Sequence, residues 1–353
     1  MLDIQDLTAQ VQQAAATKSP LQIRGGGSKH FYGAATSGTP LMMAEYQGII
    51  NYEPSELVIT ARAGTPLKEI EQLLAQQGQM LGFEPPRFSD HATLGGTVAC
   101  GLSGPRRPYA GAVRDFVLGV TLINGQGQRL KFGGQVMKNV AGYDLSRLMC
   151  GALGTLGVLL DISLKVIPKP HYEETRVLSA SFPQMQSLLA DIGLQPVPVS
   201  ATLQHEDQLY IRLSGAQGGV REAIQRIGGD TLADSDSLWH NLKEQQHAFF
   251  QQPAPLWRVS IPPMAPAIPD SLYDGQILTE WGGALRWLYS QQGEQIQQWA
   301  KAQGGHATCF RNPMAGTHIF TPLPAALLAL HQRLKARFDP EHIFNIGRIY
   351  PDL

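Results

Sequence analysis

Three consecutive glycines near the N-terminus constrain this chain most strongly. They lie in Leu21–Gly33 (LQIRGGGSKHFYG), where a short apolar strand leads into Arg24, the glycines, Ser28 and Lys29. Glycine has no Cβ atom, so successive backbone N–H groups can converge on one point and form a concave nest for an anion. Ser28 adds a hydroxyl group, and Arg24 and Lys29 add positive charge. The segment therefore predicts a phosphate or pyrophosphate site, with an ordinary surface loop as the alternative.

The order of residues excludes two common phosphate-binding loops. A Walker loop needs Gly-Lys-Ser/Thr before a helix, whereas here Ser28 precedes Lys29 and a Gly- and Thr-containing stretch, His30–Pro40, follows. The GxGxxG fingerprint that opens a helix in Rossmann folds is also absent from this segment. We therefore expect a loop nest to hold the pyrophosphate, and not the dipole of a helix.

Composition limits the classes of protein to consider. A chain of 353 residues can form two domains, and a net charge of −1 with 16% charged residues argues against a nucleic-acid or acidic-membrane surface. Cys100, Cys150 and Cys309 are far apart, which argues against an iron–sulfur cluster, a structural zinc site and a disulfide scaffold. We expect a cytoplasmic protein without a signal peptide or transmembrane segment, so that any membrane association is peripheral.

Hydrophobic spacing predicts an α+β fold. Apolar residues recur at helical spacing over 3–16, and strands are expected at 21–23 and 56–62. Thr65 is expected to cap a helix that begins at Pro66 and ends before Gly78. Further along, alternation on both sides of Asn124–Gly125 predicts a β-hairpin formed by 116–123 and 127–132.

A Pro-Lys-Pro sequence at 168–170 marks the expected end of the first domain. We expect domains at 1–170 and 171–330, and a C-terminal segment, 331–353, that packs back on the first domain. In the second domain, strands alternate with helices in a pattern typical of an antiparallel sheet with helices on one face. A doubled β-α-β motif would produce this pattern.

A second glycine-rich segment, His91–Gly111 (HATLGGTVACGLSGPRRPYAG), offers bare backbone and small hydroxyl groups. We expect a loop that a planar ring system or a pyrophosphate approaches closely, with a loop used only for tight turns as the alternative. A third segment, Gly151–Val158 (GALGTLGV), precedes a strand and suits close packing on a ligand. Together the segments favour a large dinucleotide. Arg106, Arg107 and Arg114 could bind an acidic group or form a solvated cluster.

These segments together resemble the vanillyl-alcohol oxidase / PCMH-type FAD-binding superfamily. The stretches that carry the resemblance are the glycine loop at 24–33, TLGGTVA at 93–99, KNVAGYDL at 138–145, GALGTLGV at 151–158 and FDPEHIFNIGR at 338–348. GPRRPYAGAVRDFVLGV, FGGQVMKNVAGYDLSRLM and WGGALRWL are further similar to the FAD-binding subunits of bacterial glycolate oxidase, also called glycolate dehydrogenase. The resemblance implies a PCMH-type FAD-binding domain of two lobes over 1–170, followed by an α+β cap or interface domain.

The resemblance also implies which residues hold the cofactor. Some relatives attach FAD covalently through a histidine of the glycine loop, but the matching position here is Ser28, so we expect non-covalent FAD. The nest would hold the pyrophosphate, and the C-terminal segment would reach towards the flavin. The implied cofactor-binding residues are Arg24, Gly25, Gly26, Gly27, Ser28, Lys29, Pro85, Thr93, Gly95, Gly96, Thr97, Gly101, Ser103, Gly104, Tyr109, Gly157, Val158, Asn345 and Arg348.

The chain departs from related 2-hydroxy-acid dehydrogenases at the catalytic motif. Those relatives carry GHxGDGNxH, which supplies metal ligands and a general base, whereas the nearest segment here is Gly304–Arg311 (GGHATCFR). One histidine cannot be both the ligand set and the base, so we expect no metal site. His306 as a base and Arg311 as a carboxylate clamp are the candidate catalytic residues. A packed histidine and a surface arginine are the alternative.

The resemblance implies a flavoprotein subunit of a multisubunit 2-hydroxy-acid dehydrogenase. Glycolate would be oxidised to glyoxylate mainly in a sister FAD subunit that carries the His-rich motif, and an iron–sulfur subunit would receive the electrons. The complex would be cytoplasmic or peripheral on the inner membrane. Alternatives are a self-sufficient FAD-dependent oxidoreductase that uses His306 and Arg311, and a scaffold with a structural FAD. D-lactate remains open as a substrate.

Overall fold

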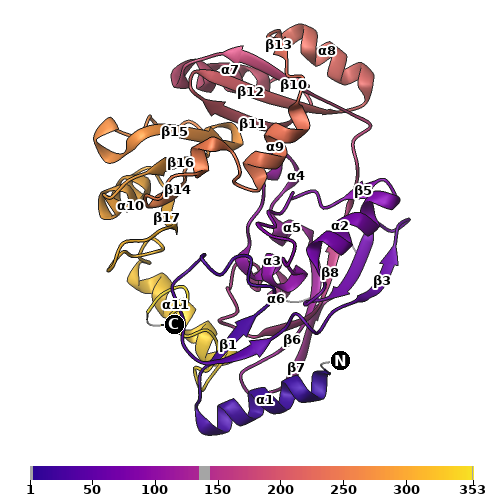
Figure 1. The fold of residues 1–353 in the computed structure, drawn as a ribbon, viewed down its shortest axis with the longest axis vertical. Helices are drawn as coiled ribbons and strands as arrows, with labels where there is room; N and C mark the ends of the chain where they lie inside the picture. The colour runs from indigo at the N-terminus through magenta and orange to yellow at the C-terminus, as the bar shows by residue number, and fades with distance from the viewer. Residues whose placement is uncertain (1–2, 135–143, 352) are drawn as a thin grey trace. The chain divides into compact units, whose positions relative to one another are not determined.

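The computed structural model describes residues 3–134, 144–351 and 353. Contacts within the chain divide it into two compact units, whose elements Figure 1 labels. The first unit comprises Met1–Ser103, Gly111–Lys169 and Pro322–Leu353, and the second comprises Gly104–Ala110 and Pro170–Thr321. The division therefore assigns the short segment 104–110 to the second unit, whereas the sequence placed it in the first domain.

The first unit is built on a five-stranded antiparallel sheet in the order β3-β4-β8-β6-β7. Strands β6 and β7 form the hairpin that the sequence predicts, with Ile123 opposite Arg129. Asn124 closes the turn, because its Oδ1 atom accepts hydrogen bonds from the N–H groups of Gln126 and Gln128. The strands are β3 (Ile49–Glu53), β4 (Val58–Arg62), β6 (Val117–Ile123), β7 (Arg129–Gly133) and β8 (Val158–Lys165).

Shorter elements complete the first unit. Its N-terminal helix buries Leu7 and Val11, and the strand that follows pairs in parallel with β2. Thr65 is not the N-cap that the sequence predicts, because its hydroxyl group binds the backbone of Gly48 and Pro66 takes the cap position without a side-chain bond. These elements are α1 (Ile4–Thr17), β1 (Leu21–Arg24), β2 (Thr39–Met42), α2 (Leu67–Gln76), β5 (Gln79–Met80), α5 (Val113–Phe116), α6 (Leu145–Leu148), β9 (Ile167–Pro168) and α11 (Ala325–Phe338).

The second glycine-rich segment is not the loop that we expect throughout its length, because it contains helix α3 (Leu94–Cys100). Thr93 caps this helix by accepting a hydrogen bond from the N–H group of Gly96. Leu94 and Val98 form a buried apolar face, and Gly101, with φ of 67°, ends the helix. The signal for an N-cap and an apolar i, i+4 pair was present in the sequence, but two adjacent glycines concealed it.

The second unit contains an eight-stranded antiparallel sheet in the order β13-β10-β12-β11-β15-β16-β14-β17. If the strands of each half are numbered along the chain, one half has the order 4-1-3-2 and the other has the same order reversed, so the β-α-β motif is doubled. The strands are β10 (Tyr172–Ser179), β11 (Val199–His205), β12 (Gln208–Gly215), β13 (Asp230–Thr231), β14 (Leu256–Ser260), β15 (Asp274–Glu280), β16 (Leu285–Tyr289) and β17 (His306–Arg311).

The two faces of this sheet differ in chemistry. Ile211 belongs to a core cluster with residues of α7 (Phe182–Gly193) and α8 (Gln217–Ile227). Val259 belongs to another, with residues of α10 (Gly293–Ala302). The opposite face carries polar and aromatic side chains, and α9 (Ser235–Lys243) places Trp239 on Arg212 there, with 5.1 Å between the guanidinium carbon and the ring centroid. Helices therefore lie on both faces, and not on one face as the sequence indicates.

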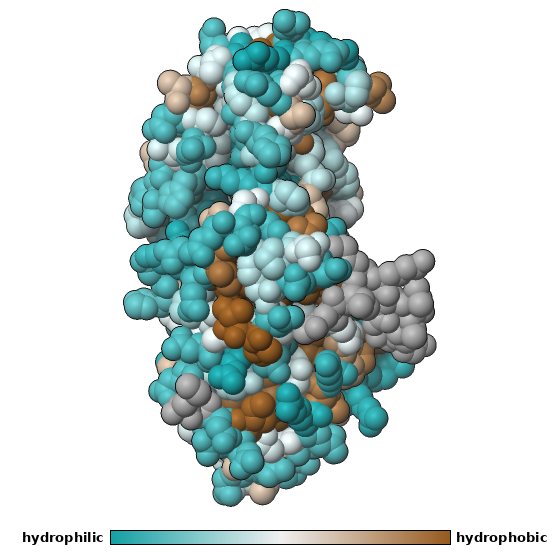
Figure 2. Space-filling model, turned by 90° about the vertical axis from the view of Figure 1, so that its right-hand side faces the viewer, coloured by the Kyte–Doolittle hydropathy of each residue, from teal (hydrophilic) through white to brown (hydrophobic). Residues whose placement is uncertain are grey.

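The surface is mostly hydrophilic, with hydrophobic side chains gathered in a few places in the view of Figure 2. Among the described residues, none of the helices has the length and hydropathy that crossing a bilayer requires. The large hydrophobic side chains that are exposed are Met42, Ile50, Tyr109, Leu194, Met264, Met314, Leu327, Leu330 and Ile346.

Candidate functional site

A cleft in the first unit brings the glycine loop together with the other glycine-rich segments. It encloses about 900 Å³, including the part that opens to solvent. Its walls come from β1 and the loop after it, from α3, from the segment before β8 and from the C-terminal segment. The predicted cofactor-binding residues that line it are Arg24, Gly25, Gly26, Gly27, Ser28, Lys29, Thr93, Gly95, Gly96, Gly157, Asn345 and Arg348.

The first two glycines of the loop are needed because another backbone segment approaches them closely. A Cβ atom on Gly26 would lie 1.5 Å from the carbonyl oxygen of His91, and one on Gly25 would lie 2.4 Å from Oγ1 of Thr93. Gly27 has φ of 77°, a conformation that side-chain-bearing residues rarely adopt. The loop therefore packs against the segment that begins α3, and the two glycine-rich segments share one wall of the cleft.

Positively charged side chains and polar atoms without a hydrogen-bond partner lie at or near this wall of the cleft. Lys29 is only 7% exposed, and its Nζ atom donates hydrogen bonds of 3.4 Å to Oγ of Ser28 and to the carbonyl of Arg87. Nε of Arg24 and Oγ1 of Thr97 are buried without a hydrogen-bond partner among the described residues. Leaving such a group unsatisfied costs about 1–3 kcal/mol. An anionic ligand that reaches Arg24 would remove this cost at the cleft.

The C-terminal segment is tied into the cleft through its side chains. Asn345 accepts a hydrogen bond from the N–H group of Ile23 (2.9 Å) and donates one to the carbonyl of Leu153 (2.7 Å). Arg348 donates to the carbonyls of His30, Tyr32 and Ala34. The two residues thus join β1, the loop after it and the segment before β8, and they hold the walls of the cleft in place.

The titration of His30 is affected by the arginines of the cleft. Burial, and then the positive charges of Arg348 and Arg24, lower the pKa of His30 below 6.5. Burial also lowers the pKa of Arg348. His30 is therefore neutral near pH 7, and the cleft's permanent positive charge comes from the arginines and Lys29.

A buried ion pair anchors the same C-terminal segment. Nζ of Lys335 donates hydrogen bonds to the carbonyls of Thr155 and Phe344 (2.8 Å each) and to the carboxylate of Asp339 (2.7 Å). That carboxylate also accepts the N–H groups of Ile343 and Phe344. Burial lowers the pKa of Lys335, and the charge of Asp339 opposes this effect. The pair fixes the loop that supplies Asn345, and sequence reasoning missed it because an i, i+4 Lys–Asp pair is typical of exposed helix surfaces.

Several predicted cofactor-binding residues do not line the cleft: Pro85, Thr97, Gly101, Ser103 and Val158 in the first unit, and Gly104 and Tyr109 in the second. Residues that line it but were not predicted are Gln22, Ile23, His30, Thr36, Met43, Ala63, Ala99, Cys100, Leu153, Gly154 and Leu159. Of these residues, Cys100 lies next to a predicted glycine, and Ile23, Ala99 and Leu159 lie two positions from one, which is the signal that could have found them. Residues 138–143 of the KNVAGYDL stretch lie outside the described residues.

The two candidate catalytic residues are in the second unit, and the structure does not bring them together. His306 and Arg311 are the first and last residues of β17, about 16 Å apart at the usual rise per residue. Nε of Arg311 donates a hydrogen bond of 2.9 Å to Oε1 of Gln245. His306 is exposed at the other end of the strand, opposite Ser260. A single small substrate cannot contact both side chains at this separation.

Two aromatic residues at strand spacing on β16 are packed in the second unit. Trp287 is 5% exposed and Tyr289 is 1% exposed. The ring of Trp287 contacts the rings of Phe250 and Phe310 edge-on, at centroid separations of 5.4 and 5.0 Å. These side chains form the interior of the second unit.

Comparison with known proteins agrees with this geometry. The model of the family described as "FAD binding domain" matches residues 2–133. "Glycolate oxidase subunit GlcE" of Escherichia coli (strain K12) is 49% identical over 350 residues, which is 99% of this chain and 98% of the relative. The chain belongs to this family of FAD-binding oxidoreductase subunits. The match runs from end to end, so the family includes both units.

More distant relatives share parts of the chain or its fold. "D-lactate dehydrogenase" of Anaerostipes hadrus is 30% identical over 190 residues, 51% of this chain and 40% of the relative. The solved structure "alkyldihydroxyacetonephosphate synthase in P1" has a TM-score of 0.66 at 14% identity, and the match covers 97% of this chain and 75% of that chain. The chain therefore has the α+β fold of this group, and it binds FAD.

The geometry of the cleft also fits FAD, independently of the comparisons. Glycines that tolerate no Cβ atom bring bare backbone to the wall, and Arg24 offers a buried, unpaired N–H group for an anion. These features suit a pyrophosphate, which needs many N–H donors and positive charge in a small space. The residues that would hold the cofactor's phosphates are those of the glycine loop.

Proposed function

We propose that this chain is the FAD-binding subunit of a multisubunit dehydrogenase that oxidises glycolate to glyoxylate. A sister flavin subunit would carry the principal site of substrate oxidation, and an iron–sulfur subunit would receive the electrons. The observation that supports this most strongly is the end-to-end match to a glycolate oxidase subunit, combined with a cleft built for a pyrophosphate. The complex would be cytoplasmic or attached peripherally to the inner membrane.

The residues of this chain support the assignment of substrate oxidation to the sister subunit. When bound, FAD accepts two electrons from a hydroxy acid or a partner group and passes them on. The glycine loop would bind the pyrophosphate non-covalently, with Ser28 at the position where some relatives attach the flavin. The chain lacks the GHxGDGNxH motif, and β17 holds His306 far from Arg311. Oxidation of substrate on the sister subunit is consistent with both facts.

An anaerobic visible spectrum of the purified chain, before and after glycolate is added, tests the proposal. We expect a yellow protein whose flavin absorbance glycolate does not reduce while the chain is isolated. After the partner subunits are added, glycolate should bleach it. Release of FAD on denaturation would show that the cofactor is non-covalent. Bleaching of the isolated chain would contradict substrate oxidation on the sister subunit and would support a self-sufficient oxidoreductase.

The flavin content of the assembled complex supplies a second test. The proposal requires more than one FAD for each set of subunits, because this chain and its sister would each bind one. A single FAD per set would contradict it. A complex that loses FAD from this chain but keeps full activity would indicate a scaffold with a structural cofactor.

A further inference from the structure

The first half of helix α11 is apolar and yet lies open to solvent (Figure 1). Every residue of 325–334 is exposed or half-buried, and the buried residues of the helix, Lys335 and Phe338, both lie in its second half. Leu327 and Leu330 are 41% and 44% exposed. A helix of this length is marginally stable in water by itself, and a surface helix normally buries an apolar stripe. The described residues leave this stripe uncovered.

Helical periodicity places two arginines beside the exposed leucines. Leu327, Leu330 and Leu334 follow one another at intervals of three and four residues, so they form one line along the helix. Arg333 lies three residues after Leu330, and Arg337 lies three residues after Leu334, so both arginines flank this line on neighbouring turns. Both arginines are exposed. We call these three leucines and two arginines the α11 seam.

The positive charge of the α11 seam is not neutralised nearby. Helix α11 contains neither aspartate nor glutamate. The two acidic residues that follow it bind other cations: Asp339 binds Lys335 at 2.7 Å, and Glu341 binds Lys18 at 3.0 Å. Within 3–134, 144–351 and 353, the two arginines of the α11 seam form no ion pair. The seam therefore offers an apolar line with one basic flank.

The second half of α11 is fixed to elements that wall the cofactor cleft. Nζ of Lys335 donates hydrogen bonds to the carbonyls of Thr155 and Phe344. The residues next to these two in the chain, Gly154 and Asn345, line the cleft. A protein that docks on the α11 seam therefore contacts a helix that is joined directly to the cleft in the same unit.

The charge and shape of the α11 seam favour one kind of partner over two others. A second copy of this chain that paired through the same helix would bring like charges together, since α11 has no acidic residue. A helix that lies on a bilayer needs an apolar face along its length, whereas α11 buries its second half at Lys335 and Phe338. A protein groove that is apolar inside and acidic along one rim matches both features of the seam.

We propose that the α11 seam is the docking surface for the iron–sulfur subunit, which presents an apolar groove with an acidic rim. The inference rests on the proposed function, which requires such a subunit as electron acceptor. Iron–sulfur clusters are held by cysteine thiolates, so a subunit that carries one brings negative charge that complements the two arginines. Helix α11 also belongs to the unit that contains the cofactor cleft, where an electron acceptor has to dock.

Anaerobic calorimetric titration of the full-length, FAD-loaded chain with the purified iron–sulfur subunit tests the surface without relying on turnover. Leu330→Gln removes an apolar contact and keeps helix propensity, and Arg333→Glu reverses a charge. We expect each to weaken binding by about tenfold or more. Leu194→Gln and Arg221→Glu are the matched controls, because both residues are exposed in the second unit, and they should bind as the wild type does. Added salt should weaken wild-type binding more than that of Arg333→Glu.

Four results would overturn the docking surface. The first is absence of binding by the wild type, and the second is equal binding by Leu330→Gln and the wild type. The third is a lower melting temperature of isolated Leu330→Gln than of Leu194→Gln, because the α11 seam would then be covered within this chain. The fourth is a loss of binding to the sister flavin subunit, or to phosphatidylglycerol vesicles, in Leu330→Gln while binding to the iron–sulfur subunit is unchanged.

Bleaching of the flavin by glycolate in a mixture of the three subunits reports the proposed function separately. If glycolate bleaches the wild-type mixture, and the α11 variants bind the iron–sulfur subunit as the wild type does, only the docking surface fails. If binding depends on the α11 seam but glycolate does not bleach the mixture, only the oxidation of glycolate fails. The two proposals can therefore be rejected independently.

Discussion

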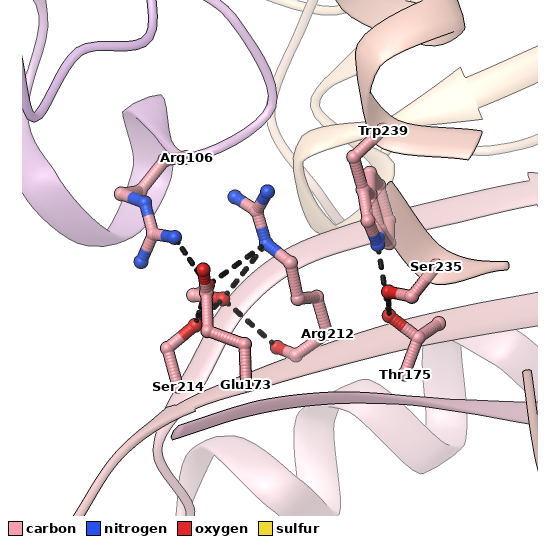
Figure 3. Close-up of polar contacts among 8 residues, drawn as sticks. Arg106, Glu173, Thr175, Arg212, Ser214, Ser235 and Trp239 are labelled. Carbon is pink, nitrogen blue, oxygen red and sulfur yellow. Dashed lines mark hydrogen bonds and ion pairs between the residues drawn. The ribbon is translucent and has the colours of Figure 1, made fainter. Parts of the chain in front are cut away.

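The cleft of the first unit is walled largely by backbone, whereas the polar face of the second unit is walled by charged and aromatic side chains. In the first unit, Gly25 and Gly26 pack directly on the segment that begins α3. In the second unit, Arg106 donates a hydrogen bond to Glu173 (Figure 3), and the guanidinium carbons of Arg107 and Arg258 lie 4.5 and 5.0 Å from the ring centroid of Trp281. Backbone walls suit a ligand that needs many N–H donors, such as a pyrophosphate. Side-chain walls suit a small ligand recognised by a few strong contacts.

The contrast also indicates which unit can change its specificity. Substitution in a backbone wall disturbs the chain path itself, because a Cβ atom at Gly26 would meet a carbonyl oxygen. Substitution in a side-chain wall removes one contact and leaves the sheet intact. The first unit is therefore suited to one cofactor, whereas side chains of the second unit can be exchanged without disturbing the path of the chain.

The largest effect is expected from Lys335→Met, which tests how far the cleft depends on its buried anchor. The substitution leaves the carboxylate of Asp339 buried without its cation, and such an uncompensated charge costs about 3–5 kcal/mol. Urea unfolding should show this loss, together with weaker FAD binding, because Lys335 joins Thr155 to Phe344. Lys301→Met, at an exposed position of α10, is the control. An unchanged unfolding midpoint in Lys335→Met would mean that the pair does not stabilise the cleft.

Gly26→Ala tests the backbone wall directly. The added methyl group would lie 1.5 Å from the carbonyl oxygen of His91, so the loop and the segment before α3 must move apart. We expect FAD affinity to fall at least a hundredfold, about 2.7 kcal/mol at 25 °C, measured by fluorescence titration of the stripped protein with FAD. Gly218→Ala is the control, because a Cβ atom on Gly218 of α8 would have open space around it. Equal affinities in the two variants would show that the glycine loop is not the cofactor's wall.

Much of the first unit was predictable because its local signals agree with its fold. The hairpin around Asn124–Gly125, the N-terminal helix and β4 have the expected type and nearly the expected bounds. The glycine-rich segments predicted the cleft because backbone segments that approach each other closely require glycine. Helix α3 was missed because helix propensity counts glycines against a helix, whereas close packing of Gly95 on Ala63 requires one.

The side-chain wall of the second unit was not predictable, because its members come from separate elements of the fold. Arg107, Arg258 and Trp281 are distant in sequence, and only the strand register and the path of 104–110 bring them together. Sequence proximity favoured pairing His306 with Arg311, but a strand extends its residues, and five positions separate the two by about 16 Å. Clusters built across a sheet need the register, which composition does not supply.

A moderate effect is expected from Glu173→Gln, which tests whether FAD binding is independent of the side-chain wall of the second unit. The substitution removes the charge that Arg106 and Arg212 share, and we expect a loss of about 1–3 kcal/mol in the free energy of unfolding. FAD content should stay at the wild-type value, because Glu173 belongs to the second unit. Thermal melts and the flavin absorbance of the same sample measure both quantities. Loss of FAD in this variant would break the comparison, since it would make the two walls interdependent.

The smallest effect is expected from pH, through two histidines of the second unit. Burial is the largest cause that lowers the pKa values of His205 and His247 below 6.5, and their rings lie 5.5 Å apart. Because the unfolded chain protonates these groups first, stability is fully present above pH 6.5 and declines as the pH falls from there towards the lowered pKa values. The melting temperature should therefore drop by a few degrees between pH 7 and about pH 5.

His247→Asn should flatten this pH dependence while it keeps the local structure. Nδ1 of His247 accepts a hydrogen bond from the N–H group of Phe249, and an asparagine oxygen can accept the same bond at the start of a helical turn. The difference in melting temperature between the variant and the wild type should consequently shrink or reverse as the pH falls. His331→Asn, on α11 of the first unit, is the matched control. If the melting temperatures of both variants depend on pH as that of the wild type does, His247 is not the source of the acid sensitivity. The stability of the second unit would then depend on protonation no more than that of the first.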